Sequence, residues 1–120
     1  MKRHETGIRG EKLAGDFLKK KGYHLLETNY RCRYGEIDIV ARKEDCLVFC
    51  EVRTKTTLAF GTPEESISQV KIRHMERAAE NYVQEHAGKG LNWRIDLIAI
   101  ELDAGYKLRR MEQIENVSSG

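Results

Sequence analysis

The sequence predicts a mixed α/β fold, in which helices flank a β-sheet in the element order αβββαβ(β). Two segments, residues 6–21 and 62–86, repeat apolar side chains at the spacing of an amphipathic helix. Other segments show the alternation or the short apolar runs that are typical of strands: residues 23–32, 36–42, 46–54, 93–102 and, more weakly, 106–114. Because an amphipathic helix must bury its apolar side, we expect both helices to pack against a mixed sheet.

The first helix is predicted over residues 6–21, where Ala14 and Leu18 form an apolar i,i+4 pair. Gly22 supplies its stop, since glycine readily takes the left-handed conformation that ends helices. The strand of residues 23–32 follows, and an arginine-bearing turn leads from it into a hairpin of two further strands.

The second helix has a clear predicted start. Thr62 fits the N-cap, Pro63 fits the first helical position, and Glu65 completes a capping box with Thr62. Apolar positions from Ile67 onward carry this predicted helix to about His86. The two remaining strands follow it, and the last of them is predicted to lie at an edge of the sheet.

Length and composition limit the class of protein. A chain of 120 residues with 40% hydrophobic residues is expected to form one domain, with a core over residues 7–114 and a loose tail over residues 115–120. No apolar run approaches the roughly 20 residues that cross a bilayer, and the first residues lack the apolar stretch of a signal peptide. We therefore expect a soluble, cytoplasmic protein with no membrane partner.

The net charge and the number of cysteines exclude fewer classes of protein than length and hydrophobicity do. The 21 basic and 19 acidic residues give a net charge of +2, so no overall polycation indicates nucleic acid. A carboxylate metal site beside a basic binding surface would also give a nearly neutral chain. Three cysteines are an odd number, which argues against a disulfide framework, and Cys46 and Cys50 are expected to be buried thiols.

A register argument places two carboxylates opposite each other in the hairpin. If Glu44 and Asp45 form a two-residue turn, Asp38 faces Glu51 directly. Residues paired in this way have Cβ atoms about 4.5–5.5 Å apart, where like charges repel. A divalent ion would remove that repulsion, and Mg²⁺ or Mn²⁺ suits a site of one or two carboxylates with water and phosphate oxygens.

The same face of the hairpin carries further charges. Strand alternation puts Glu36, Arg53 and Lys55 beside the two carboxylates, and Glu36 is a further candidate metal ligand. An ion-paired network, Glu36 with Arg53 and Glu51 with Lys55, explains the same pattern on a solvated strand face. The spacing leaves both interpretations open.

Two charged residues fall where the helices should be apolar. Viewed down the helix axis, Glu11 lies at the edge of the apolar arc of the first helix. Lys71 lies inside the apolar arc of the second helix, at nearly the same angle as Ala78 and Tyr82. Each is either a boundary residue whose stem runs along the apolar surface or a group directed at the charged sheet face. A lysine in that place would be directed at an anion.

Several short motifs over residues 7–102 carry a family resemblance: Gly10-Glu11, Gly22-Tyr23, Asn29-Tyr30-Arg31, Gly35-Glu36-Ile37-Asp38, Val48-Phe49-Cys50-Glu51-Val52-Arg53, Phe60-Gly61-Thr62-Pro63, Lys71 and Arg94-Ile95-Asp96. With these motifs the chain resembles the YraN-like family of small, largely uncharacterised bacterial proteins. That family belongs to the PD-(D/E)XK, restriction-endonuclease-like superfamily. The resemblance therefore implies a restriction-endonuclease-like mixed sheet.

The resemblance also implies catalytic roles. Asp38 and Glu51 correspond to metal ligands, and Glu11 maps by position to a helix glutamate that serves the metal site in similar Holliday-junction resolvases. Arg53 stands where the superfamily signature has lysine. Because arginine stays charged, it can hold a phosphate but cannot act as a base. The missing ammonium would then come from Lys55 or Lys71.

The sequence thus predicts Mg²⁺-dependent cleavage of phosphodiester bonds in DNA, with branched or otherwise structured DNA as a candidate substrate. Six residues are candidates for nucleic-acid contact through charge or stacking: Tyr30, Arg31, Arg33, Tyr34, Arg53 and Lys71. Two alternatives are a non-catalytic nucleic-acid-binding module on a nuclease scaffold and a protein-interaction domain with a structural acidic cluster. Fold alone does not separate them, and the oligomeric state stays open, with a homodimer among the options.

Overall fold

The computed structural model describes residues 3–86 and 92–118. Its elements are α1 (Arg3–Lys20), β1 (His24–Cys32), β2 (Gly35–Lys43), β3 (Cys46–Lys55), the short 3₁₀ helix η1 (Glu64–Ser66), α2 (Gln69–Glu85), β4 (Asn92–Leu102) and β5 (Leu108–Ile114). The predicted mixed α/β class and the order of its helices and strands are confirmed, with β5 as a full strand at the end.

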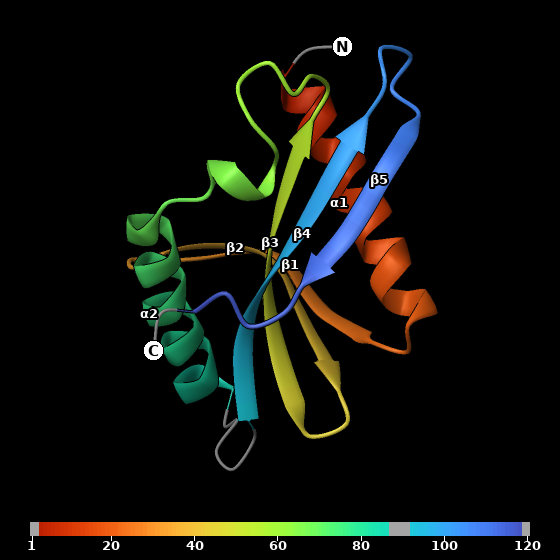
Figure 1. Ribbon diagram of the computed structural model, residues 1–120. Helices are drawn as coiled ribbons and strands as arrows, with labels where there is room; N and C mark the ends of the chain where they lie inside the picture. The colour runs from red at the N-terminus through yellow and green to blue at the C-terminus, as the bar shows by residue number, and fades with distance from the viewer. Residues whose placement is uncertain (1–2, 87–91, 119–120) are drawn as a thin grey trace.

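The strands form one five-stranded open sheet in the order β1-β2-β3-β4-β5. All neighbours are antiparallel except β3 and β4, which are parallel. A parallel pair needs a crossover, and the segment containing η1 and α2 provides it. The two long helices lie on opposite sides of the sheet (Figure 1).

Each face of the sheet has its own apolar cluster. On one face, Ala14 and Leu18 of α1 pack with Val48 and other residues of β2, β3 and β4. On the other face, Met75 and further residues of α2 pack with Phe49. Because successive side chains of a strand point to opposite sides, the neighbours Val48 and Phe49 contribute to different clusters. The core is thus two layers of helix against one central sheet.

The predicted hairpin register between β2 and β3 is confirmed for the paired residues. Pairing runs from Lys43↔Cys46 at the turn to Ile39↔Cys50. Glu44, in the two-residue turn, has a positive φ of 55°, as tight hairpin turns require.

Beyond the last pair the sheet divides into two arms. β2 continues to pair with β1 as far as Cys32↔Gly35, and β3 continues to pair with β4 as far as Lys55↔Glu101. No pairing joins β2 to β3 in this region. The two arms diverge as a fork, which Figure 1 shows where β2 turns away from β3.

The prediction of one helix over residues 62–86 is wrong in its first part. Thr62 and Glu65 do form the capping contacts, with the Thr62 N–H donating to Glu65 Oε1 at 2.8 Å, but only the short η1 follows. The chain then extends at Ile67, whose side chain packs against the α2 cluster. α2 is a separate helix with its own N-cap, because the Ser68 side chain accepts a hydrogen bond from the N–H of Lys71.

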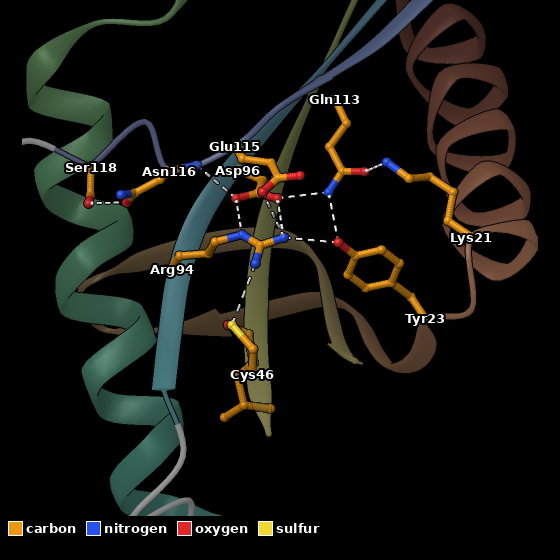
Figure 2. A network of polar contacts seen from close by, with 10 residues as sticks. Lys21, Tyr23, Cys46, Arg94, Asp96, Gln113, Glu115, Asn116 and Ser118 are labelled. Atoms are coloured by element: carbon orange, nitrogen blue, oxygen red, sulfur yellow. Dashed lines mark hydrogen bonds and ion pairs between the residues drawn. The ribbon is translucent and has the colours of Figure 1, made fainter. Parts of the chain in front are cut away.

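The prediction of a loose tail is wrong for residues 115–118. Asn116 donates its N–H to Asp96 Oδ1 at 3.0 Å, and Val117 donates its N–H to the carbonyl of Ile95 at 2.8 Å. These bonds hold the segment after β5 against β4, as Figure 2 shows for Asn116 and Asp96.

Asp96 is the centre of a buried polar network (Figure 2). Its carboxylate is 0% exposed and accepts hydrogen bonds from Arg94 Nε at 2.9 Å and Gln113 Nε2 at 2.8 Å. Arg94 also donates to the hydroxyl of Tyr23, just after α1. Buried charges need such partners, so this network ties the connection between α1 and β1 to β4 and β5.

The three cysteines are free thiols. Cys50 is buried as predicted, whereas Cys46, the first residue of β3, is only half-buried, and its sulfur lies 3.7 Å from Arg94 Nη1.

Within residues 3–86 and 92–118, no helix is both long and apolar enough to cross a bilayer.

Candidate functional site

A groove of about 1000 Å³ opens at the fork between the two arms of the sheet. β2, β3, α1 and the loop after β3 all contribute to its walls. The charged side chains that line it are Glu11, Glu36, Asp38, Glu51, Arg53 and Lys55. The structure therefore brings together the charged hairpin face and the helix glutamate that the sequence predicts as a site.

Asp38 lies where β2 leaves β3. The next pair in the hairpin register would be Asp38 with Glu51, but the backbone pairing ends one position earlier, at Ile39↔Cys50. The Asp38 carboxylate instead accepts a hydrogen bond from the N–H of Val52 at 2.8 Å. A side chain thus replaces the missing backbone partner of β3, because a buried N–H needs an acceptor.

Glu51 is the buried carboxylate of the site, with 5% of its surface exposed. Burial raises its pKa to about 7, and the charge of Asp38 and a hydrogen bond with it add to this effect. The positive charges of Lys71 and Arg53 act in the opposite direction. The site therefore holds two interacting carboxyl groups, one of which takes up a proton near neutral pH.

Two cations contact Glu51 from different elements. Arg53 Nε of β3 lies 2.9 Å from Oε2, and Lys71 Nζ of α2 lies 4.0 Å from Oε1. The Arg53 N–H does not point at the oxygen, so Nε is ion-paired but has no hydrogen-bond partner. Lys71 is thus directed at an anion, one of the two alternatives for its place on the helix.

The predicted alternative ion pairs do not form as expected. Glu36 pairs with Arg31 at 3.7 Å rather than with Arg53. Glu51 pairs with Arg53 and Lys71 rather than with Lys55. In the part of the chain that the structure describes, Lys55 lines the groove without an acidic partner.

Glu11 reaches the groove because α1 approaches β3 closely. Gly10 makes this possible, since a Cβ at that position would collide with the hydroxyl of Thr54 on β3. Partial burial and the charge of Asp38 raise the pKa of Glu11, while a hydrogen bond with Asn29 lowers it.

Asn29 is a site residue for which the sequence predicts no role. It stands on β1 between the pairs Thr28↔Ile39 and Tyr30↔Ile37, opposite Asp38, and has a positive φ of 53°. Asparagine is among the few residues that take this conformation readily. The only sequence signal was its place in a motif of the family resemblance, because its neighbours in space come from α1 and β2.

The donor set suits a two-carboxylate metal site. Within the described residues, no group of three or more His, Cys, Asp or Glu side chains is arranged to hold a metal ion. Asp38 and Glu51 are nevertheless adjacent, and their charges disfavour each other. Mg²⁺ needs only one or two carboxylates because it keeps several waters, so these residues fit such an ion.

The candidates for nucleic-acid contact lie in different environments. Tyr30 offers no stacking surface: it is 6% exposed, its ring packs on Tyr82 at 5.2 Å, and its hydroxyl donates to Glu85. The alternation of β1 puts Tyr30 under α2, which explains the wrong prediction. At the exposed turn after β1, the Arg33 guanidinium lies over the Tyr34 ring at 4.8 Å.

Comparison with known proteins identifies the family. The model of a family described as "Uncharacterised protein family UPF0102" matches residues 10–100. A UPF0102 protein of Caldicellulosiruptor saccharolyticus is 39% identical over 116 residues, which cover 97% of this chain and 98% of that protein. A UPF0102 protein of Dehalococcoides mccartyi is 44% identical over 114 residues, which cover 95% and 93%. The predicted YraN-like resemblance is confirmed, and the chain belongs to the uncharacterised protein family UPF0102.

Proposed function

We propose that this protein is a metal-dependent nuclease that cleaves phosphodiester bonds in DNA within the groove at the fork. One observation carries the proposal: the buried Glu51 lies beside Asp38 at the point where β2 and β3 separate, with Arg53 in contact. Two carboxylates and a cation that line one groove match the needs of phosphodiester hydrolysis. The order Asp38, Glu51, Arg53 also supports a place in the PD-(D/E)XK superfamily.

Asp38 and Glu51 would hold Mg²⁺ or Mn²⁺, with Glu11 and Glu36 on the walls of the same groove. When bound, the ion would lower the pKa of a water and neutralise charge on the phosphate. The Val52 N–H holds the Asp38 carboxylate in place, and burial holds Glu51. A site positioned by backbone and packing needs little rearrangement when a ligand arrives.

The cations of the groove would bind the phosphate. Arg53 and Lys71 are partly exposed while they contact Glu51, so both can meet an anion that enters the groove. Arg53 can present its planar guanidinium to two phosphate oxygens. Lys55 adds a positive charge that has no acidic partner among the described residues.

A non-catalytic nucleic-acid-binding module is the second candidate, favoured by Arg53. The arginine occupies the position of the signature lysine and cannot give up its proton. Such a module would bind DNA in a salt-dependent way, with a log–log slope of about −0.9 for each phosphate neutralised on a duplex, and would cleave nothing.

The test is a cleavage assay on linear, flapped and four-way DNA, with and without Mg²⁺ or Mn²⁺. Wild type should cleave only with the metal, and Asp38→Asn and Glu51→Gln should lose this activity. Glu44→Gln is a matched control, because Glu44 lies in the exposed turn at the other end of the same hairpin. Metal-dependent cleavage that survives in Asp38→Asn would come from a contaminant and contradict the proposal, as would binding without cleavage by wild type.

A further inference from the structure

The loop after β3 displays an aromatic side chain to solvent. Phe60 is 89% exposed, more than any other large apolar side chain in the described part of the chain. The Gly61 N–H donates to the Leu58 carbonyl at 3.1 Å, which closes a turn with Phe60 near its tip. Gly61 has a φ of 99°, and the Thr62–Glu65 capping contacts follow directly, so the turn is held at its base.

A second groove, of about 600 Å³, continues from the first one. The two share Lys55, Thr56 and Thr57, and Leu58 and Arg109 lie farther along the second. Its surface thus begins beside the candidate phosphate-binding cations and passes the base of the turn that carries Phe60.

In the second groove, Arg110 and Glu101 form an ion pair, and Asp103 is held by backbone hydrogen bonds. Arg110 contacts Glu101 at 2.6 Å and two further carboxylates, while Asp103 accepts the N–H groups of its own turn. Lys55 and Arg109 have no acidic partner within residues 3–86 and 92–118. The cations left to attract a ligand therefore favour an anionic one.

We infer that the second groove and the turn of Leu58 and Phe60 bind a single-stranded arm of the nucleic-acid substrate. Lys55 and Arg109 contact its phosphates, and an unpaired base stacks on Phe60. Aromatic side chains stack on any unpaired base, whereas the bases of a duplex are already stacked on one another. This inference rests on the proposed function and extends it: the substrate class is DNA with an unpaired segment beside the cleavage site.

The test is binding without divalent metal, in EDTA, so that it does not depend on catalysis. Wild type and variants are titrated with a flapped DNA and with a blunt duplex of the same length. The flap carries 2-aminopurine at its first unpaired position, which reports stacking by its fluorescence. Phe60→Ala should weaken flap binding roughly 5- to 150-fold and leave duplex binding unchanged. Phe60→Trp should restore flap binding and the fluorescence change.

Two further variants make the test specific. Phe60→Leu keeps an apolar group but no ring, so it should behave like Phe60→Ala. Ile8→Ala removes another exposed apolar side chain, from α1 outside the two grooves, and should change neither affinity. The inference would be overturned if Phe60→Ala lost affinity equally for both DNAs or lost none. It would also be overturned if Phe60→Leu bound the flap as well as wild type, or if wild type did not bind the flap at all.

The cleavage assay separates this inference from the proposed function. Selective flap binding that depends on Phe60, in a protein that cleaves nothing, supports the stacking site and contradicts the nuclease proposal. If wild type cleaves with metal but substitution of Phe60 leaves flap binding unchanged, the result supports the nuclease and overturns the stacking site. Loss of self-association in Phe60→Ala, with DNA binding intact, would show that the ring contacts a second copy of the chain instead.

Discussion

The N–H of Val52 on β3 donates a 2.8 Å hydrogen bond to Oδ2 of Asp38 on β2. The contact lies directly beyond the last backbone pair of the two strands, so it marks the place where the sheet divides. Asp38 therefore satisfies a backbone group as well as presenting a charge to the groove. Removing the charge and removing the acceptor are separate experiments, because Asp38→Asn keeps an oxygen for the N–H and Asp38→Ala does not.

The first prediction concerns the metal. Mg²⁺ or Mn²⁺ should bind wild type and raise its melting temperature, since an ion relieves the repulsion between Asp38 and Glu51. Asp38→Asn should lose both effects, and without metal it should be no less stable than wild type. Calorimetric titration and thermal unfolding measure these outcomes. No binding to wild type at millimolar concentrations of either ion would contradict the prediction.

The second prediction concerns pH. The pKa of Glu51 rises from its ordinary value of 4.5 to about 7 on folding, so the folded state binds more protons between these values. Stability from this group is present below about pH 4.5 and is lost as the pH rises to about 7. Without metal, Glu51→Gln should be more stable than wild type at pH 8, by on the order of 3 kcal/mol, and nearly equal to it at pH 4.5.

Urea unfolding in EDTA at the two pH values measures this difference. Glu44→Gln, in the exposed hairpin turn, should give the same small change at both. A stability difference for Glu51→Gln that does not depend on pH would mean that its carboxyl is not the titrating group.

The third prediction concerns Arg53 and separates an enzyme from a binding module. In a nuclease, Arg53→Lys should retain or increase metal-dependent cleavage, because the signature of the proposed superfamily has lysine at this place on β3. Arg53→Ala should lose most of the cleavage, since it removes a cation from the phosphate site. In a binding module neither variant cleaves, and Arg53→Ala weakens binding by about 1.5–3 kcal/mol. If Arg53→Ala cleaved at the wild-type rate, Arg53 would have no catalytic role, and Lys55 or Lys71 would be the candidate for stabilising the phosphate charge.

The fourth prediction concerns two glycines of α1. Gly10→Ala should destabilise the protein by about 1–3 kcal/mol, because the new methyl group meets Thr54 on β3. Gly7→Ala on the same helix meets nothing within 4 Å and should be neutral or stabilise it, by up to about 1 kcal/mol. Thr54→Ala should recover part of the loss in Gly10→Ala. Equal effects of the two glycine substitutions in chemical unfolding would contradict a close approach of α1 to β3.

The fifth prediction concerns the network around Asp96 (Figure 2). Asp96→Ala should cost about 3–5 kcal/mol, because Arg94 then keeps a partly buried charge without its main partner. Gln113→Ala removes a neutral donor to the same carboxylate and should cost about 1 kcal/mol. Chemical unfolding compares the two variants. A smaller cost for Asp96→Ala than for Gln113→Ala would contradict the central place of this carboxylate.

Local patterns in the sequence determined the elements and the hairpin register. A two-residue turn at Glu44 and Asp45 specifies the pairing of β2 with β3, because the length of the turn fixes the register of a hairpin, and strand alternation then decides which side chains share a face. The same rule puts the charged residues of the hairpin on one face. The family resemblance then added Glu11, which lies on another element.

Contacts between distant segments decided the rest. After Ile39↔Cys50 the sheet divides, with β2 still paired to β1 and β3 still paired to β4, and hairpin spacing does not contain that information. The burial of Tyr30 under α2 and the hydrogen bond of Asn29 to Glu11 likewise join residues far apart in the chain. Periodicity and turn chemistry act over a few residues. The groove is formed by packing over the whole sheet, so the sequence determined which charges the site contains and the tertiary structure decided how they meet.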